Sequence, residues 1–293
     1  MDLMALMDRF RSDEKCRAYL EDLRWPNGFR CPRCEGRRIS RVTTRQQFDC
    51  DSCRYQFSVT SGTIFHDSHL PLSKWLAAVY LMCESRKGIS ANQLKRTLAV
   101  SYKTAWYLCH RIRAAMAEMN PVKLRGTVEA DETWAGGKQE GIGMGHYREK
   151  MTAVLGALQR GGKVRLQMAH RLDKSTLRRF LRQYDPEALR LITDENRAWR
   201  GVGGRKASHA TVNHTAKEWV RGDIHTNGIE NVWSLLNRSI TGAYHKISKK
   251  HLPAYLDELA WRFNNRQNPW LFRDTVLKLL DAKALPYQKL VSS

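Results

Sequence analysis

Residues 31–53 read CPRCEGRRISRVTTRQQFDCDSC, and this stretch carries the strongest structural signal in the chain. Cys31 and Cys34 form one Cys-x-x-Cys pair, Cys50 and Cys53 form a second, and 15 residues separate the two pairs. Each pair can turn two thiolates toward one ion, and two pairs complete the tetrahedron that structural zinc prefers. The spacing therefore predicts a zinc ribbon with one structural Zn²⁺ and no open catalytic position. A redox role for one pair is the alternative.

The residues around the cysteine pairs fit the same ribbon. Apolar side chains near alternation indicate short hairpin strands, which are too few to be stable without a metal: Ile39, Val42, Phe48, Tyr55 and Phe57. Arginines are frequent between residues 30 and 45, and we assign Arg37, Arg38 and Arg41 to contacts with DNA phosphates. A solvated charged face is the alternative for each of them.

The composition of the whole chain also indicates a nucleic-acid partner. The 293 residues include 50 Lys and Arg against 29 Asp and Glu, a net charge of +21, which attracts a polyanion. No run approaches 18 apolar residues and no signal-peptide pattern opens the chain, so we expect no membrane partner and a cytoplasmic location. Seven cysteines, an odd number, favour a reducing compartment over a disulfide framework.

Residues 88–116 follow the ribbon and read as two helices joined by a short break. Ser90 can cap the first helix, residues 99–101 form the break, and the second helix is longer. Such a pair resembles a helix-turn-helix, whose second helix enters the major groove. We assign DNA contacts on this second helix to Lys103, Arg111 and Arg113. A helical hairpin that never touches DNA is the alternative.

The pattern changes again after Pro121. Polar and apolar residues alternate in residues 126–133, which places Glu129 and Asp131 on one face of a strand. Two further strands, a helix and a fourth strand are expected next, over residues 151–158, 164–168, 173–184 and 189–193. A strand meander followed by a helix, a strand and further helices is the order of an RNase H-like α/β fold.

Three acidic residues lie at informative places in this pattern. Asp131 lies on the first strand, Asp194 ends the fourth strand, and Glu230 falls near the start of the helix in residues 225–245. Carboxylates so placed can converge on two Mg²⁺ ions, which require oxygen ligands and support in-line phosphoryl displacement. For each acid taken alone, a helix cap or an ion-pair partner is the alternative.

Several motifs together resemble the insertion-sequence transposases of the ISXO-like group, over about residues 15–267. Besides the ribbon they are VEADETWAGGK (128–138), LITDENRAW (191–199), HTNGIENVWSLLNR (225–238), GAYHKISKKHL (242–252) and YLDELAWRFNNR (255–266). The resemblance implies that Asp131, Asp194 and Glu230 hold Mg²⁺, with Mn²⁺ as a substitute. It also implies that water and then a DNA 3′-hydroxyl act as nucleophiles.

Some details of the third motif depart from that group or leave a choice. Asn227 stands one helical turn before Glu230 and is the alternative third ligand, because some relatives have asparagine there. The group often has a lysine seven residues after the third acid, whereas this chain has Asn237 with Arg238 beside it, so Arg238 is the candidate cation. His225 could order a metal-bound water. Phosphate contacts beyond the third acid are assigned to Lys249 and Lys250.

These observations predict an α+β, multi-domain chain. We expect an N-terminal helix and zinc ribbon (1–66), a helix-turn-helix-like segment (67–120), an RNase H-like catalytic domain (121–270) and a C-terminal tail (271–293). The predicted protein is a transposase that binds terminal inverted repeats and target DNA as a homo-oligomer, associated with the bacterial nucleoid. A non-catalytic DNA-binding regulator and an RNase H-like nuclease are the alternatives.

Overall fold

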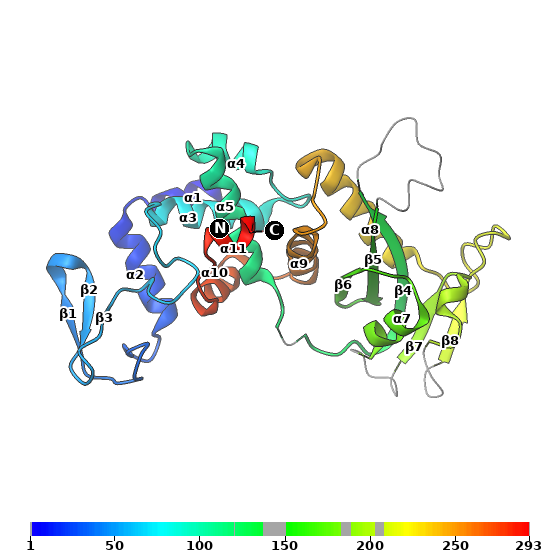
Figure 1. Ribbon diagram of the computed structural model, residues 1–293, viewed down its shortest axis with the longest axis horizontal. Helices are drawn as coiled ribbons and strands as arrows, with labels where there is room; N and C mark the ends of the chain where they lie inside the picture. Colours follow the sequence, from blue (N-terminus) through cyan, green and yellow to red (C-terminus); the bar gives the residue numbers. More distant parts are fainter. Residues whose placement is uncertain (1, 120, 137–150, 183–188, 203–207, 293) are drawn as a thin grey trace. The chain divides into compact units, whose positions relative to one another are not determined.

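The computed structural model describes residues 2–119, 121–136, 151–182, 189–202 and 208–292 (Figure 1). The chain forms two compact units, which are described separately below: Met1–Met116 together with Asn268–Ser293, and Ala117–Gln267. Within the described residues, no helix combines the length and the apolar character that a membrane crossing requires.

The first unit contains a small three-stranded antiparallel sheet at the place where the ribbon was predicted. Strand β1 (Ile39–Val42) pairs with β2 (Gln47–Cys50), which pairs with β3 (Gln56–Phe57). Phe48 and Phe57 are buried beneath Trp25, whose ring meets both edge to face. These aromatic rings and the cysteines form almost the whole core of the ribbon, so the sheet has little apolar area of its own.

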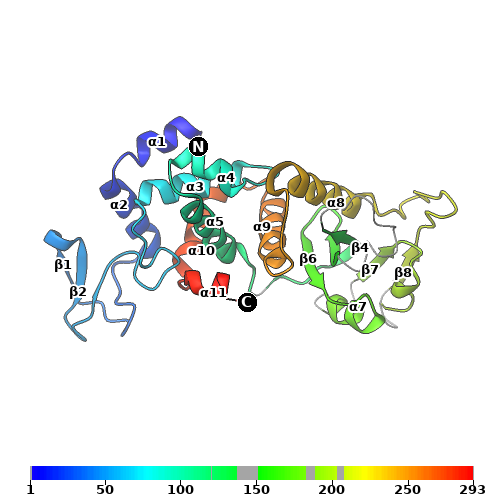
Figure 2. The ribbon, with the colours of Figure 1, turned by 45° about the horizontal axis from the view of Figure 1, so that its top comes forward.

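Helices make up the rest of the first unit, and they include the C-terminal segment. Figure 2 shows α3, α5 and α10 lying together, and α10 also packs against α2. Two hydrogen bonds tie α10 to distant residues: Ile64 N donates to Leu279 O at 3.2 Å, and Cys83 Sγ donates to Thr275 Oγ1 at 3.3 Å. Residues 271–293 thus belong to this unit, which differs from the tail expected from the sequence. The helices are α1 (Leu3–Arg9), α2 (Asp13–Arg24), α3 (Leu72–Glu84), α4 (Ala91–Leu98), α5 (Tyr102–Met116), α10 (Leu271–Asp281) and α11 (Tyr287–Val291).

The two helices expected in residues 88–116 are α4 and α5. Ser90 caps α4 by accepting a hydrogen bond from Gln93 N at 3.1 Å. Ala99 ends α4 in the left-handed conformation, with φ of 49°, and the chain turns into α5 within three residues. The break at residues 99–101 therefore lies where the sequence predicted it.

The second unit is built on a five-stranded mixed sheet in the order β6-β5-β4-β7-β8. β4, β5 and β6 form an antiparallel meander, whereas β7 and β8 join β4 as parallel strands. The strands are β4 (Gly126–Ala135), β5 (Thr152–Gln159), β6 (Val164–Ala169), β7 (Leu189–Thr193) and β8 (Ser208–Thr211). The expected meander, helix and fourth strand are all present.

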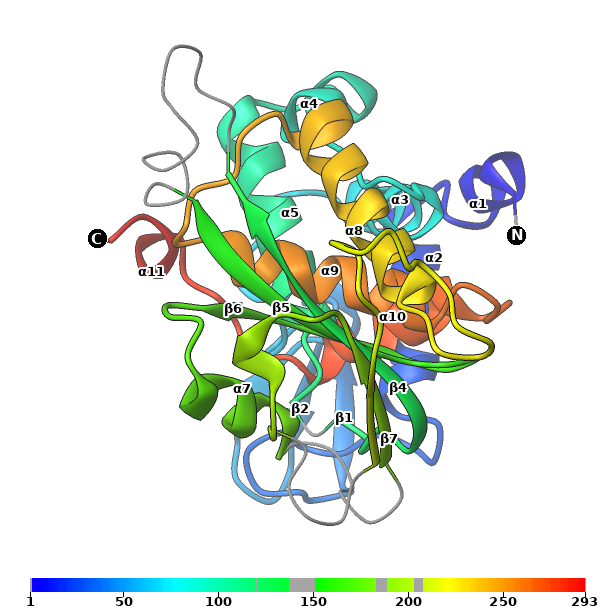
Figure 3. The same ribbon diagram turned by 90° about the vertical axis from the view of Figure 1, so that its right-hand side faces the viewer.

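Helices cover both faces of this sheet (Figure 3). On one face α7 (Lys174–Leu181) and the buried Trp199 of a 3₁₀ turn (Arg197–Trp199) pack over Val128, Ala130 and Leu155. On the other face α8 (Asn227–Ser239), a π-helical turn (Ile240–Tyr244) and α9 (Leu252–Asn264) pack over Val154 and Leu158. Polar side chains on β4 therefore face one or the other helical layer, depending on whether their residue number is odd or even.

Candidate functional site

The strand register brings the first two predicted acids together. β4 and β7 run parallel, and Glu129 of β4 lies opposite Ile192 of β7. If this register continues for two more residues, Asp194 lies opposite Asp131. β7 ends at Thr193, and Asp194 therefore emerges at the carboxyl end of the strand. Oxygens of Asp131, Asp194 and Glu132 lie within 4.8 Å of one another. This geometry can hold a hard divalent cation.

Burial makes the charged forms of these carboxyls unfavourable without such a cation. Burial raises the pKa of Asp131 to about 7; the hydrogen bond from Trp233 opposes the rise, whereas the neighbouring charges of Asp194 and Glu132 add to it. Burial likewise raises the pKa of Glu132 and of Asp194. A cation that binds the three oxygens would remove this cost.

Glu132 is a member of the cluster that the sequence did not single out. It follows Asp131 on β4, so it leaves the sheet on the opposite face, toward α7. Its carboxylate accepts hydrogen bonds from Trp199 Nε1, at 2.7 Å, and from Asn196 Nδ2. The backbone Asn196 N also donates to Asp194 Oδ1 at 3.1 Å, so one residue links Glu132, through its side chain, to Asp194, through its backbone. The one sequence feature that could have indicated Glu132 is that it directly follows Asp131.

α8 lies directly against the strand that carries Asp131. Trp233 Nε1 donates to Asp131 Oδ2 at 2.8 Å and thereby fixes that carboxylate. The indole lies over Gly156 of β5, where an added Cβ would be 2.3 Å from a ring carbon of Trp233 and 2.8 Å from Ile229 Cδ1. Glycine at position 156 is what allows the helix to approach the sheet so closely.

A carboxylate from β4 also holds the beginning of α8. Glu129 is 1% exposed, and it accepts hydrogen bonds from Ile229 N at 3.0 Å and from Arg160 Nε at 2.8 Å. Thr226 precedes the helix without capping it through its side chain, so Glu129 takes the place of an N-cap. Gly228 touches this carboxylate, because an added Cβ would lie 2.7 Å from Glu129 Oε2. The third acid is thus on a helix whose start is anchored to the first strand.

Glu230 itself lies beside the three-acid cluster without belonging to it. Its Oε1 accepts a hydrogen bond from Thr226 Oγ1 at 2.7 Å, and His214 Nε2 is 3.8 Å from the same oxygen. Glu230 as a residue is partly buried, although its side chain is 43% exposed. Asn227, the alternative ligand in the first turn of α8, is an exposed residue. The structure therefore brings Asp131 and Asp194 together and leaves Glu230 outside their 4.8 Å cluster.

The auxiliary residues predicted near Glu230 have separate surroundings. His225 Nδ1 lies 3.5 Å from Glu129 Oε1, at the anchored end of α8. Arg238 is exposed on the last turn of α8, where its Nε donates to Ser234 O at 3.2 Å. Lys249 and Lys250 are exposed on the turn before α9.

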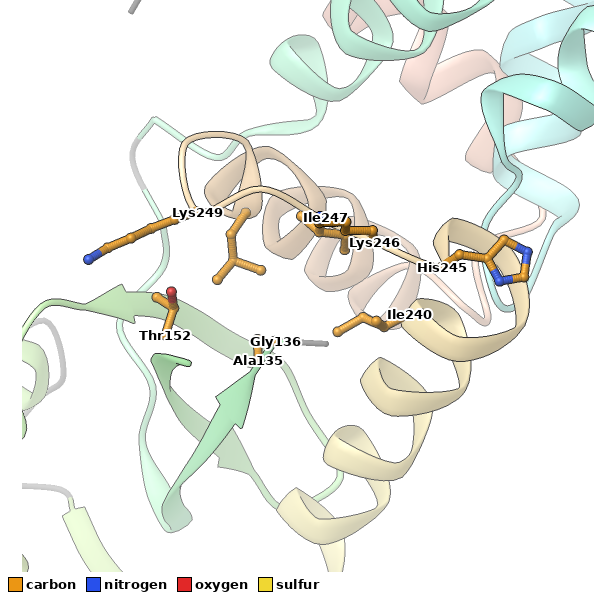
Figure 4. A pocket seen from close by; sticks show the side chains of 9 residues that line it. Ala135, Gly136, Thr152, Ile240, His245, Lys246, Ile247 and Lys249 are labelled. Atoms are coloured by element: carbon orange, nitrogen blue, oxygen red, sulfur yellow. The ribbon is translucent and has the colours of Figure 1, made fainter. Parts of the chain in front are cut away.

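Lys249 also borders a small hollow at the end of β4 (Figure 4). The hollow measures about 20 Å³, which is room for one water molecule and not for a nucleotide. Its other lining residues come from the end of β4, the start of β5, the segment around the π-helical turn and the start of α9. We therefore treat Lys249 as a surface cation and not as part of a ligand pocket.

The four predicted zinc ligands converge in the first unit. Their sulfurs all lie within 4.8 Å of one another, with Cys31 and Cys53 at 3.6 Å and Cys34 and Cys50 also at 3.6 Å. Four sulfurs bound to zinc at about 2.3 Å would be roughly 3.8 Å apart, so the donor set fits a tetrahedral Zn²⁺.

The two cysteine turns share one backbone geometry. Glu35 N donates to Cys31 O, and Arg54 N donates to Cys50 O, each from a residue with positive φ. In each turn the first cysteine also donates its own N–H to the carbonyl of the residue that follows the one with positive φ: Cys31 N to Gly36 O, and Cys50 N to Tyr55 O. Repetition of one tight turn aims the sulfurs from both sides at the same point.

The predicted DNA-binding cations are not all at the surface. Arg37 and Arg38 are exposed, and so is Lys103 in the first turn of α5, with its Nζ 4.6 Å from the centre of the Tyr287 ring. Arg41 is exposed as well, but its guanidinium pairs with Glu21 of α2.

The prediction of DNA contacts for Arg111 and Arg113 is wrong for the chain in this conformation. They are only 3% and 2% exposed, because the second half of α5 is buried inside the unit. The guanidinium of Arg111 donates to the carbonyls of Ile64 and His66 and stacks on Trp75. It satisfies buried backbone oxygens instead of reaching a phosphate.

Comparison with known proteins gives consistent matches. Residues 123–264 match the family model described as an ISXO2-like transposase domain, and residues 11–56 match the model described as a transposase zinc-ribbon domain. The uncharacterized protein in transposable element ISH50 of Halobacterium salinarum is 31% identical over 266 residues, which cover 84% of this chain and 89% of that protein. An uncharacterized transposase-like protein of Haemophilus influenzae is 29% identical over 97 residues, 33% of this chain and 76% of that protein.

The matched ranges coincide with the elements described above. The first range contains the five-stranded sheet with α8 and α9, and the second contains α2 and the four cysteines. The predicted α+β, multi-domain organisation with an N-terminal zinc ribbon is confirmed, and so is the predicted family resemblance.

Proposed function

This chain belongs to the family of ISXO2-like transposases, and from that premise we propose that it is the DDE transposase of an insertion sequence. It binds the terminal inverted repeats of the element and a target DNA, and it catalyses Mg²⁺-dependent cleavage and strand transfer. It acts in the bacterial cytoplasm, at the nucleoid.

One observation carries this proposal: the oxygens of Asp131, Asp194 and Glu132 lie within 4.8 Å of one another where β4 and β7 run side by side. When bound there, two Mg²⁺ ions, or Mn²⁺ in their place, would activate the attacking oxygen and stabilise the leaving oxygen of a phosphodiester. Asp131 is held for this task by Trp233, and Asp194 by the backbone of Asn196. The strand order of the second unit, a meander extended by two parallel strands, agrees with an RNase H-like domain.

We assign the third ligand to Glu230 rather than to Asn227. Glu230 is partly buried and contacts Thr226, whose side chain is buried, whereas Asn227 is exposed. A carboxylate is also a stronger ligand for Mg²⁺ than an amide oxygen. Arg238, on the same helix, supplies a cation for the DNA backbone, and His225 supports the start of the helix through Glu129.

The first unit contributes most of the DNA-binding residues. Its ribbon holds one structural Zn²⁺ through the four cysteines, and zinc binding and ribbon folding are coupled because the apolar core there is so small. Arg37, Arg38 and Lys103 contact phosphates from this unit, and Lys249 and Lys250 do so from the catalytic unit. The protein works as a dimer or larger homo-oligomer, because two element ends must be cut and joined together.

The test is a cleavage and joining assay with the purified full chain, Mg²⁺ and a target plasmid. The labelled DNA is taken from the two regions that flank the gene for this chain. Joined products without added nuclease are the expected result. Cleavage without joining would instead favour an RNase H-like nuclease, since a nuclease uses water alone as its nucleophile. Binding of the labelled ends with no cleavage under any divalent ion would favour the non-catalytic regulator.

A further inference from the structure

We propose that His214 is a further functional side chain of the acid site, a positioning residue that holds Glu230 toward Asp194. This proposal rests on the proposed function, because it concerns how the third acid reaches the metal-binding cluster. His214 lies between β8 and α8, outside any helix or strand. Its Nε2 is buried, has no hydrogen-bond partner, and faces Glu230 Oε1 at 3.8 Å.

The segment that carries His214 is fixed to the strand that carries the second acid. Glu195 directly follows Asp194, and its carboxylate accepts hydrogen bonds from His214 N at 2.9 Å, from Thr215 N at 2.9 Å and from Thr215 Oγ1 at 2.6 Å. Glu195 therefore holds the backbone of His214 close to Asp194.

The imidazole is also fixed on its face. Its ring packs on the indole of Trp219, with the ring centres 4.7 Å apart, and Lys217 N donates to His214 O within the same turn. With backbone and ring both held, Nε2 has one direction in which to point, and Glu230 lies there. The backbone of His214 is tied to Glu195, the residue after Asp194, and its Nε2 faces Glu230. The histidine thus lies between the second and third acids.

The two contacts of Glu230 show what this arrangement achieves. Thr226 Oγ1 and His214 Nε2 both address Oε1. The other oxygen, Oε2, is therefore the one that we assign to the cation, and a hydrogen bond from His214 Nε2 to Oε1 would fix the direction of Oε2. We assign Nε2 to hydrogen bonding and not to metal ligation, because Mg²⁺ prefers oxygen ligands. Partners that orient a ligand in this way commonly change metal affinity by about 10- to 100-fold.

Two substitutions separate this role from simple packing. His214→Phe keeps the stacking on Trp219 and removes the donor, whereas His214→Gln keeps an N–H donor and gives up most of the stacking. The measurement is Mn²⁺ binding by calorimetry, on the zinc-loaded full chain in magnesium-free buffer. We expect His214→Phe to weaken Mn²⁺ binding about 10-fold and His214→Gln to restore most of that loss. Equal thermal unfolding of the three proteins verifies that they are folded.

A double-mutant cycle with Glu230→Gln completes the test and covers the case in which one histidine variant folds poorly. If His214 acts through Glu230, His214→Phe costs little further Mn²⁺ affinity once Glu230 is changed. Additive losses would overturn the proposal, as would wild-type affinity in His214→Phe or a loss in His214→Gln equal to that in His214→Phe. Asp131→Asn serves as the reference: if it binds Mn²⁺ like the wild type, the acid site itself is wrong, and the proposed function fails rather than the role of His214.

Discussion

Asp131 shows at the scale of one residue how the site is prepared for a cation. Its carboxyl is partly buried, and burial is the largest cause of its raised pKa of about 7. The hydrogen bond from Trp233 orients the group without compensating that burial. A buried carboxyl with a raised pKa lowers the stability of the metal-free protein when it ionises. Such carboxyls are typical of functional sites.

This cost predicts a pH-dependent stability. Between pH 3.8 and about 7 the unfolded chain releases the Asp131 proton while the folded chain keeps it, so the metal-free protein loses stability as the pH rises across that window. Asp131→Asn removes the loss and should unfold at a higher temperature than the wild type at about pH 8, with a smaller difference at about pH 5. Calorimetry of the zinc-loaded chain in magnesium-free buffer measures this. Equal unfolding temperatures at the higher pH would contradict the burial of the charge.

Single residues also mark where sequence reasoning stops. The pairing of Asp131 with Asp194 could be predicted, because both lie at strand positions that the alternation and the apolar run define. Glu132 could not, because alternation assigns it to the opposite face, and only the Asn196 and Trp199 contacts near the strand end bring it to the cluster. Arg111 was misjudged because helical periodicity does not reveal which polar side chains satisfy buried carbonyls.

At the scale of elements, the packing of the start of α8 against the sheet determines the position of the third acid, Glu230. Gly228→Ala places a Cβ 2.7 Å from Glu129 Oε2 and 2.8 Å from Leu158 Cδ2, so the start of the helix must shift. We expect a loss of about 1–3 kcal/mol in stability and a strong loss of cleavage. Thermal unfolding and the cleavage assay measure the two effects.

Gly242→Ala is the matched control in the same unit. An added Cβ at this glycine meets nothing within 4 Å, so its effect should stay within about 1 kcal/mol and leave cleavage intact. If both variants behave like the wild type, the close approach of α8 to β4 does not govern the site.

The ribbon is a second element with a sharp prediction. Cys50→Ser removes one of four ligands, so the chain should carry much less than one zinc per molecule and should lose binding to the terminal repeats. Cys16→Ala, which changes a buried cysteine of α2 outside the ribbon, should keep its zinc. Metal analysis after gel filtration decides the matter. A full zinc equivalent in Cys50→Ser would refute the four-cysteine site.

Elements were predicted as well as their local signals allowed. The cysteine spacing, the break at Ala99 and the strand meander are all encoded within short stretches of chain. The packing of α10 against α2, α3 and α5 is not, because these contacts join residues about two hundred positions apart and no local pattern specifies them. Residues 271–293 therefore read as a tail in the sequence, whereas in the structure α10 contributes to the core of the first unit.

At the scale of the whole molecule, the charge of +21 predicts a steep dependence of DNA binding on salt. Each phosphate contact that is lost should lower the slope of log K against log salt by about 0.9. The double substitution of the exposed Arg37 and Arg38 by alanine should therefore weaken binding to all sequences and reduce the slope by about 1–2. Titrations at several salt concentrations measure this, and an unchanged slope would remove the ribbon arginines from the interface.

The most direct measurement is the joining assay repeated with two Asp→Asn variants of the catalytic unit. Asp194→Asn changes the acid at the end of β7, whereas Asp173→Asn changes the exposed cap of α7, where asparagine caps equally well. We predict that Asp194→Asn still binds the terminal repeats but loses cleavage and joining by more than the roughly 100-fold that changes around a metal ligand cost. Asp173→Asn should match the wild type. Joining by Asp194→Asn at the wild-type rate would contradict the assignment of the acid cluster as the catalytic centre.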